Sequence, residues 1–141
     1  MIYNNPFLND KFNKELIEKS INILLNPEKY LGKPTEIDSE GTRVWKNSKG
    51  QLHRDNGLPA VIYKNGDKYW YQNGKYHRDN GPAIIYSNRA KFWYQNDRLH
   101  REDGPAVISS GGIKEWWLNG KKYSEEEFKD LMKNRIKPLE K

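Results

Sequence analysis

Hydrophobic and polar residues follow two periods along this chain, a helical one near both ends and a strand-like one between them. Near the N-terminus, apolar side chains recur every three or four residues and mark one side of a helix over 10–25. These side chains are Phe12, Leu16, Ile17, Ile21, Leu24 and Leu25. Asn9 or Asp10 can cap this helix, and Pro27 ends it. The polar stretch 32–41 is then expected to be a connecting loop.

From residue 42 onward, the sequence repeats itself every 23 residues. The copies read YWYQNGKYHRDNGPAIIY (69–86), FWYQNDRLHREDGPAVIS (92–109) and EWWLNGKKY (115–123), and a divergent copy reads VWKNSKGQLHRDNGLPAVIY (44–63). A period of this length is typical of repeat arrays, in which neighbouring units stack to bury their apolar sides. A side chain that recurs in every copy is therefore interpreted first as a structural element of the unit.

Turn residues divide each copy into short strands. Asn73-Gly74 and Asn119-Gly120 are typical of type I′ hairpin turns, and they follow strands such as 68–72. Each of the three longer copies has a second glycine turn that is followed by a proline. This proline marks the start of a second strand, because proline cannot donate a hydrogen bond to a ladder. These second strands are 60–63, 83–86 and 106–108. The sequence predicts a mainly β fold: a single antiparallel meander of about three and a half hairpin repeats, flanked by an N-terminal and a C-terminal amphipathic helix.

Three segments follow from this interpretation. Residues 1–40 form an N-terminal helical segment and linker, 41–123 form the β-hairpin repeats, and 124–141 form a C-terminal capping helix. Ser124 and Glu127 match the capping-box pattern that begins such a helix. The apolar side of this helix consists of Phe128, Leu131, Met132 and Ile136. We expect the helix to fold onto the last hairpin, because an uncovered edge strand invites aggregation.

Composition narrows the function classes. The chain has no cysteine, which excludes disulfides, thiolate catalysis and cysteine-based zinc sites. No secretory signal and no apolar run of membrane-spanning length is apparent, so a cytoplasmic location is expected. Mean hydropathy is −1.09, yet 13% of residues are aromatic. The net charge is +6, and residues 41–123 carry 15 Lys/Arg against 7 Asp/Glu, a local charge of +8. A basic repeat array favours an anionic partner.

Strand alternation predicts two aromatic-rich faces of the sheet. One face is expected to carry Trp45, Trp70, Trp93 and Trp116 in register. The other is expected to carry Tyr71, Tyr94 and Trp117 beside Tyr69 and Phe92. Lysines also recur at the repeat spacing and predict a cationic row. The candidate binding residues are therefore Tyr71, Tyr94, Trp117, Lys68, Lys91 and Lys114.

The most catalytic-looking motif is a histidine followed by an arginine and a carboxylate. It occurs at His53/Arg54/Asp55, His77/Arg78/Asp79 and His100/Arg101/Glu102. Such groups could serve phosphodiester cleavage, but their repetition favours a structural role, in which each histidine stacks on the aromatic ladder and each arginine–acid pair stabilises the turn. Equivalent histidines are expected roughly 9–10 Å apart, two strand spacings, which is too far for one metal ion. We therefore expect no catalytic residues, no metal and no cofactor.

The unit W-x-x-N-G-K-x-H, carried by WYQNGKYH (70–77), resembles the MORN repeat. The insert HRDNGPA (77–83) departs from the shorter glycine step of that family and looks like a variant found in bacterial, phage and giant-virus proteins. The resemblance covers 41–123 and implies a hairpin array that serves as a scaffold or binding surface. It favours a non-enzymatic protein-binding module, with a phage-encoded inhibitor of a host defence enzyme, acting in the host cytoplasm, as one hypothesis. The alternative is a basic aromatic sheet that binds single-stranded nucleic acid or another polyanion.

Overall fold

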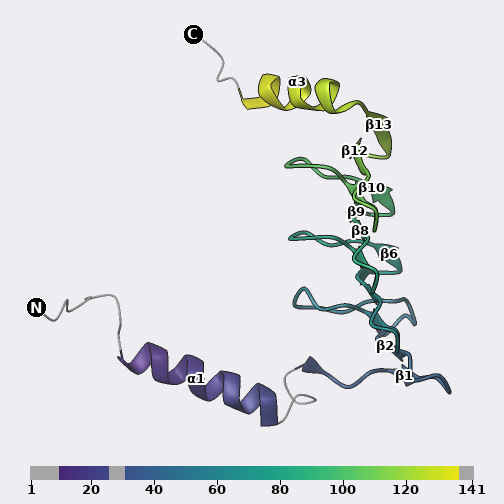
Figure 1. Cartoon of the computed structure of the whole chain (residues 1–141). Helices are drawn as coiled ribbons and strands as arrows, with labels where there is room; N and C mark the ends of the chain where they lie inside the picture. Colours follow the sequence, from purple (N-terminus) through teal and green to yellow (C-terminus); the bar gives the residue numbers. More distant parts are fainter. Residues whose placement is uncertain (1–9, 26–30, 137–141) are drawn as a thin grey trace, which may run out of the picture. The chain divides into compact units, whose positions relative to one another are not determined.

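The computed structural model describes residues 10–25 and 31–136, and the chain divides into two compact units, Met1–Lys33 and Pro34–Lys141. The first unit contains the predicted N-terminal helix, α1 (Asp10–Leu25) (Figure 1). Its apolar side chains at Leu16, Ile17, Ile21, Leu24 and Leu25 are between 47% and 80% exposed. The predicted cap at Asn9 and stop at Pro27 lie outside the described residues. Within the described ranges, neither helix has the length and apolar character needed to cross a membrane.

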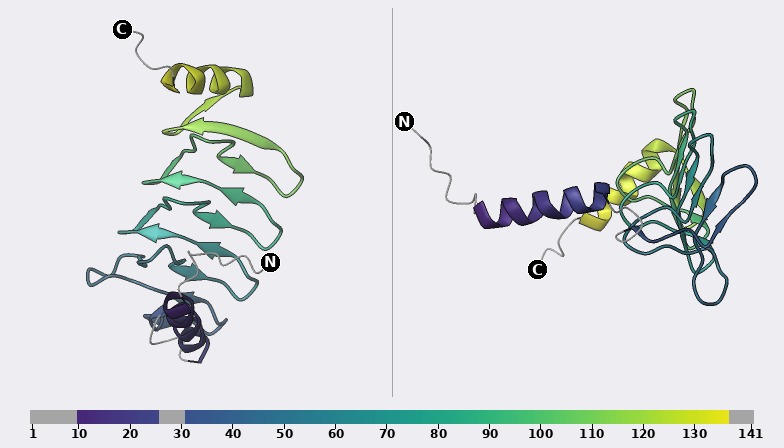
Figure 2. Two further views of the ribbon diagram at one scale, coloured as in Figure 1. Left: turned by 90° about the vertical axis from the view of Figure 1, so that its left-hand side faces the viewer. Right: turned by 90° about the horizontal axis from the view of Figure 1, so that it is seen from below.

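The second unit confirms the mainly β fold. Its nine-stranded antiparallel sheet has the order β1-β2-β3-β4-β7-β8-β11-β12-β13, and β5-β6 and β9-β10 form separate hairpins (Figure 2). The sheet strands are β1 (Glu36–Ile37), β2 (Arg43–Val44), β3 (Val61–Ile62), β4 (Lys68–Tyr69), β7 (Ile84–Ile85), β8 (Lys91–Phe92), β11 (Val107–Ile108), β12 (Lys114–Leu118) and β13 (Lys121–Tyr123). The hairpin strands are β5 (Tyr71–Gln72), β6 (Lys75–Tyr76), β9 (Tyr94–Gln95) and β10 (Arg98–Leu99).

The continuous strand predicted at 68–72 is wrong, because the chain changes pairing partner at Trp70. The backbone N–H of Trp70 donates to the carbonyl of Ala83 in the sheet at 2.7 Å, whereas its own carbonyl accepts from His77 in the hairpin at 3.2 Å. Trp93 makes the same two bonds one repeat later, to Ala106 and from His100. Each complete repeat therefore contributes two strands to the sheet and one separate hairpin beside it.

The loop expected at 32–41 contains an edge strand. β1 pairs with β2 through Glu36↔Val44 and Ile37↔Arg43. The Asp38 carboxylate holds the turn between them, accepting the N–H groups of Glu40 and Thr42 at 2.9 Å each. Hydrogen bonds from Thr42 are the main reason that the pKa of Asp38 is lowered. Two residues show no alternation, so the sequence pattern could not reveal this strand.

The sheet has little depth, and its core consists of small residues and indole rings. Ala60, Ala83 and Ala106 are fully buried, and one aliphatic residue of each following strand is also buried, namely Val61, Ile84 and Val107. Trp45 and Trp70 are 8% and 6% exposed, while Trp93 and Trp116 are half-buried. Trp45 and Trp70 thus belong to the core, whereas Trp93 and Trp116 are only partly covered.

The C-terminal helix α3 (Glu125–Ile136) begins at the predicted capping box. The Ser124 N–H donates to the Glu127 carboxylate at 2.8 Å, and the Glu127 N–H donates to the Ser124 hydroxyl at 3.2 Å. α3 packs against β12 and β13 and buries Phe128. Arg135 adds an ion pair to Glu102 at 2.8 Å. The helix therefore contacts the last strand of the sheet, as the sequence predicted.

Candidate functional site

Seven aromatic rings form one connected surface on the second unit, which we call the tyrosine cluster. Its members are Tyr63, Tyr69, Tyr71, Tyr76, Tyr86, Phe92 and Tyr94. The Tyr69 ring centroid lies 5.2 Å from Tyr63, 6.2 Å from Tyr76 and 5.9 Å from Tyr86. Tyr76 links the sheet to the hairpins, at 4.4 Å from Tyr71 and 5.3 Å from Tyr94. None of the seven rings is buried, and Tyr63 is 41% exposed.

The structure brings together two of the three predicted aromatic site residues. Tyr71 and Tyr94 belong to the cluster, on either side of Tyr76. Trp117 makes no ring contact with another described aromatic residue; its indole N–H donates to Glu115 at 2.9 Å. Sequence reasoning missed Tyr76, although a signal was present. That tyrosine stands where the neighbouring copies have Leu52 and Leu99, and a departure from the repeat indicates a role other than folding of the unit.

The pKa of the Tyr69, Tyr71 and Tyr94 hydroxyls is raised, so these three groups stay protonated at neutral pH. Partial burial is the first cause that raises the pKa of Tyr69, Tyr71 and Tyr94, and the other tyrosines add to it. Asp67 adds a smaller effect at Tyr69, and Asp97 does so at Tyr94. At these three positions the cluster therefore offers neutral rings whose hydroxyl groups can donate hydrogen bonds to a ligand.

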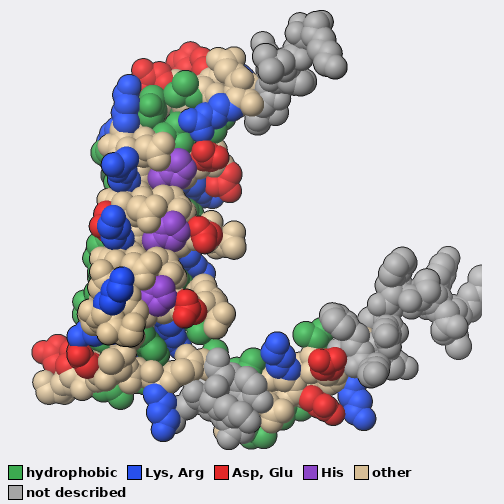
Figure 3. Space-filling model, turned by 180° about the vertical axis from the view of Figure 1, so that it is seen from behind, with side chains coloured by type: hydrophobic (Ala, Val, Ile, Leu, Met, Phe, Trp, Pro, Cys, Tyr) green, Lys and Arg blue, Asp and Glu red, His purple; other side chains and the backbone are tan. Residues whose placement is uncertain are grey.

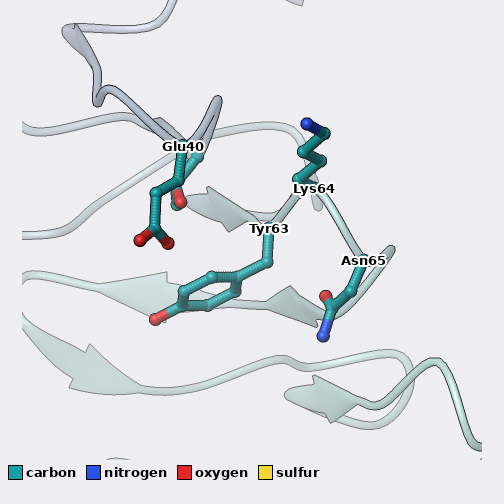
Figure 4. A pocket seen from close by; sticks show the side chains of 5 residues that line it. Glu40, Tyr63, Lys64 and Asn65 are labelled. Atoms are coloured by element: carbon teal, nitrogen blue, oxygen red, sulfur yellow. The ribbon is translucent and has the colours of Figure 1, made fainter.

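A hollow of about 510 Å³ lies beside the most exposed ring of the cluster (Figure 4). It is lined by Glu40, Thr42, Tyr63, Lys64 and Asn65. Figure 4 shows the Glu40 carboxylate and the Tyr63 hydroxyl extending to the same side, while the Lys64 ammonium points away from both. The Glu40 carboxylate makes no ion pair or hydrogen bond with any described side chain, so this end of the cluster carries an available negative charge.

The opposite face of the sheet carries the predicted lysines in register. Directly paired residues of antiparallel strands place their side chains on the same face. The pairs across the sheet are Ile37↔Arg43, Arg43↔Ile62, Ile62↔Lys68, Lys68↔Ile85, Ile85↔Lys91, Lys91↔Ile108 and Ile108↔Lys114. We call this row the cation–isoleucine ladder. It lies on the other side of the sheet from Tyr69 and Phe92, which neighbour Lys68 and Lys91 along the chain.

The three histidines form a column, with carboxylates along one side of it (Figure 3). Each Nδ1 accepts a backbone N–H from the next hairpin: His53 from Asn73 at 3.1 Å, His77 from Asn96 at 3.2 Å and His100 from Asn119 at 3.0 Å. Each Nε2 faces an acid, at 3.0 Å in His53–Asp55, 2.9 Å in His77–Asp79 and 3.8 Å in His100–Glu102. Both ring nitrogens of His53 and His77 are thus hydrogen-bonded, whereas the 3.8 Å between His100 Nε2 and Glu102 is too long for a hydrogen bond.

The arginines stack on the tryptophans, a role that the sequence interpretation gave to the histidines. The guanidinium carbons of Arg54, Arg78 and Arg101 lie 3.7, 3.9 and 4.1 Å from the ring centres of Trp45, Trp70 and Trp93. Each guanidinium also donates to the carbonyl of the following proline at 3.1 Å. Burial lowers the pKa of Arg54 and Arg78.

Equivalent hollows recur between successive motif loops. One of about 760 Å³ is lined by residues that include Arg78, Trp93 and His100, and one of about 190 Å³ by residues that include Gly57, Trp70 and His77. In the described ranges, no three His, Asp or Glu side chains gather closely enough to hold a metal ion. The hollows repeat with the units, as expected of gaps left by stacking.

No family model, no curated protein and no solved structure matches this chain. The resemblance of 41–123 to the MORN repeat therefore stays a prediction from the motif.

We expect His77 to act as a link between hairpins. His77→Ala should lower the free energy of unfolding by about 1–2 kcal/mol, because the Asn96 N–H loses its acceptor. His77→Asn should recover part of the loss, because its side-chain oxygen can accept near the Nδ1 position. Chemical denaturation followed by circular dichroism measures both. An alanine variant as stable as the asparagine variant would contradict the role of this bond.

Proposed function

We propose that this chain is a non-enzymatic protein-binding module whose tyrosine cluster contacts the partner. One observation carries the proposal: seven rings touch in a continuous series, and none of them is buried. Rings needed only for the core would be covered, as Trp45 and Trp70 are. Tyrosine is enriched at interface hot spots because its large ring becomes buried on binding while its hydroxyl finds a partner.

The repeat architecture supports the same proposal. A stacked array offers much surface for its mass and holds the rings on a hydrogen-bonded framework, which limits the entropy lost on binding. The MORN-like motif is associated with scaffolds and binding surfaces and favours a protein partner. The narrower hypothesis, a phage-encoded inhibitor of a host defence enzyme in the host cytoplasm, rests on that resemblance alone.

The nucleic-acid alternative has one supporting observation, the in-register row of Lys68, Lys91 and Lys114. Single strands are usually held by rings that stack on bases with cations beside them. Here the rings of the tyrosine cluster and the lysine row occupy opposite faces of the sheet. This separation favours a protein partner over a single-stranded nucleic acid.

Affinity capture with a variant built from the chain's own repeats tests the proposal. Ser109 replaces Tyr63 and Tyr86 in the third copy, and Leu52 and Leu99 replace Tyr76 in others. The triple variant Tyr63→Ser/Tyr76→Leu/Tyr86→Ser therefore removes three rings with residues that the same backbone accepts. We expect this variant to keep the circular dichroism spectrum of the wild type. The amount of partner protein that it captures from lysate should be at least about ten-fold lower.

The matched control changes the opposite face. The triple variant Lys68→Gln/Lys91→Gln/Lys114→Gln should capture the same protein as the wild type, and nuclease treatment of the lysate should not change the amount. Capture that survives loss of the three tyrosines, or that disappears with nuclease, would overturn the proposal.

A further inference from the structure

The cation–isoleucine ladder is a second surface with its own chemistry. Its four cations, Arg43, Lys68, Lys91 and Lys114, are all exposed, and none forms an ion pair with another described residue. Other cations of the second unit form ion pairs, as in Lys122–Glu115 at 2.6 Å and Lys129–Glu125 at 2.7 Å. Among the residues that the structure describes in the second unit, none therefore compensates the positive charge of the ladder.

Aliphatic side chains separate these cations at every step. Ile37 is 63% exposed, and Ile62, Ile85 and Ile108 are half-buried. Each isoleucine pairs directly with the cation on either side, except for Ile37 at the edge. The ladder thus alternates apolar and positive positions across the strands, from β1 to β12.

Strand spacing sets the period of this alternation. Neighbouring strands lie about 4.8 Å apart, so the cations recur about every 9.6 Å with an isoleucine midway between them. From Arg43 to Lys114 the ladder crosses six strand spacings, roughly 29 Å. An α-helix rises about 10.5 Å in seven residues and about 4.5–6 Å in three or four. Over the three periods from Arg43 to Lys114, the helix and the ladder differ in length by only about 3 Å, which flexible lysine and arginine side chains can absorb.

We propose that the ladder binds an acidic amphipathic helix, laid across the strands, of a second protein that differs from the partner of the tyrosine cluster. The helix carries Glu or Asp every seventh residue, opposite Arg43, Lys68, Lys91 and Lys114, and an apolar residue three or four positions later, opposite the isoleucines. This surface is distinct from the tyrosine cluster and goes beyond the proposed function.

The isoleucines favour a protein over a nucleic acid. A phosphodiester backbone offers charge but little apolar surface, and the ladder positions contain no aromatic ring on which a base could stack. The face of an amphipathic helix supplies both carboxylates and apolar side chains at the required spacing. The charge of +8 over 41–123 attracts such a partner at long range.

A synthetic helix provides the probe. The peptide has three seven-residue repeats, about 31 Å long, with Glu at the first position of each repeat and Leu four residues later. Two control peptides replace Glu with Gln, or keep the composition and place Glu every five residues. Binding to the full chain is measured by fluorescence anisotropy at physiological salt. We expect each control peptide to bind at least about ten-fold more weakly than the probe.

Variants of the chain test both components of the ladder. The variant Lys68→Gln/Lys91→Gln/Lys114→Gln should bind the probe peptide at least about ten-fold more weakly than the wild type. The variant Ile62→Thr/Ile85→Thr/Ile108→Thr should bind it at least about five-fold more weakly. Circular dichroism checks that both variants fold. The tyrosine triple variant should bind the probe as the wild type does, so a failure here leaves the proposed function untouched.

Three results would overturn this inference. The first is equal binding of the peptide with out-of-phase glutamates. The second is an isoleucine variant that folds and binds unchanged. The third is tighter binding, lost in the lysine variant, of single-stranded oligothymidine, duplex DNA or phosphatidylglycerol vesicles, which would assign the ladder to nucleic acid or to an anionic membrane.

Discussion

Replacing Trp70 with alanine should lower the free energy of unfolding by about 3–5 kcal/mol, as expected for a large buried aromatic side chain. The ring is only 6% exposed, and its indole N–H donates to the Gly57 carbonyl at 2.7 Å. The Arg78 guanidinium lies 3.9 Å from the ring centre. Alanine would leave a cavity, an unpaired carbonyl and a partly buried cation without its aromatic partner.

Two further variants test this explanation. Trp93→Ala should lower the free energy of unfolding by less than Trp70→Ala does, because Trp93 is half-buried. Trp70→Phe should have an intermediate effect, because it keeps a ring under the guanidinium and loses the indole N–H. All three are measured by urea denaturation followed by circular dichroism. A loss below about 1 kcal/mol for Trp70→Ala would mean that the indole is not part of the core.

Replacing Gly81 with alanine should destabilise the protein by about 2–3 kcal/mol through two separate effects. A Cβ atom there would lie 3.1 Å from the guanidinium carbon of Arg78, closer than carbon atoms normally approach. Gly81 also has φ +147°, a conformation that side chains with a Cβ rarely adopt. The substitution would therefore push Arg78 away from Trp70 and strain the loop.

Two other glycines separate these effects. Gly104 has the same 3.1 Å approach to the Arg101 guanidinium without a positive φ, whereas Gly112 has φ +85° with no atom within 4 Å of its Cβ position. Gly104→Ala reports the steric effect alone, and Gly112→Ala reports the conformational effect alone. Thermal unfolding should rank Gly81→Ala as the least stable of the three. If Gly112→Ala were equally unstable, the contact between glycine and guanidinium would contribute nothing.

The structure explains why the motif His-Arg-acid-x-Gly-Pro-Ala repeats. In the copy at 77–83, His77 accepts a bond from the next hairpin, Arg78 stacks on Trp70, and Gly81 leaves room for the guanidinium. Pro82 provides the carbonyl that accepts from Arg78, and Ala83 is fully buried. The copies that begin at His53 and His100 make the corresponding arginine–tryptophan and arginine–proline contacts. The motif is thereby accounted for by contacts between and within repeats.

The sequence by itself determined the features that depend on local chemistry and period. The 23-residue spacing predicted the repeats, and the helical stripe and the capping box at Ser124 predicted α1 and α3. The equal spacing of Lys68, Lys91 and Lys114 predicted their common face, because identical positions in identical units share an orientation. Each of these features follows from residues within one element or from exact repetition.

Only the tertiary structure decided which groups form contacts between distant parts of the repeat array. The break at Trp70 and the strand β1 depend on hydrogen bonds to distant backbone, which an alternation pattern does not encode. The roles of Arg78 and His77 were exchanged relative to the sequence interpretation because the indole ring lies on the arginine side of the chain. The tyrosine cluster combines residues of the sheet and the hairpins, and only the packing of these elements brings Tyr76 within ring contact of Tyr69. A single sequence shows the spacing of side chains along the chain, but the surface available to a partner depends on how separate strands meet.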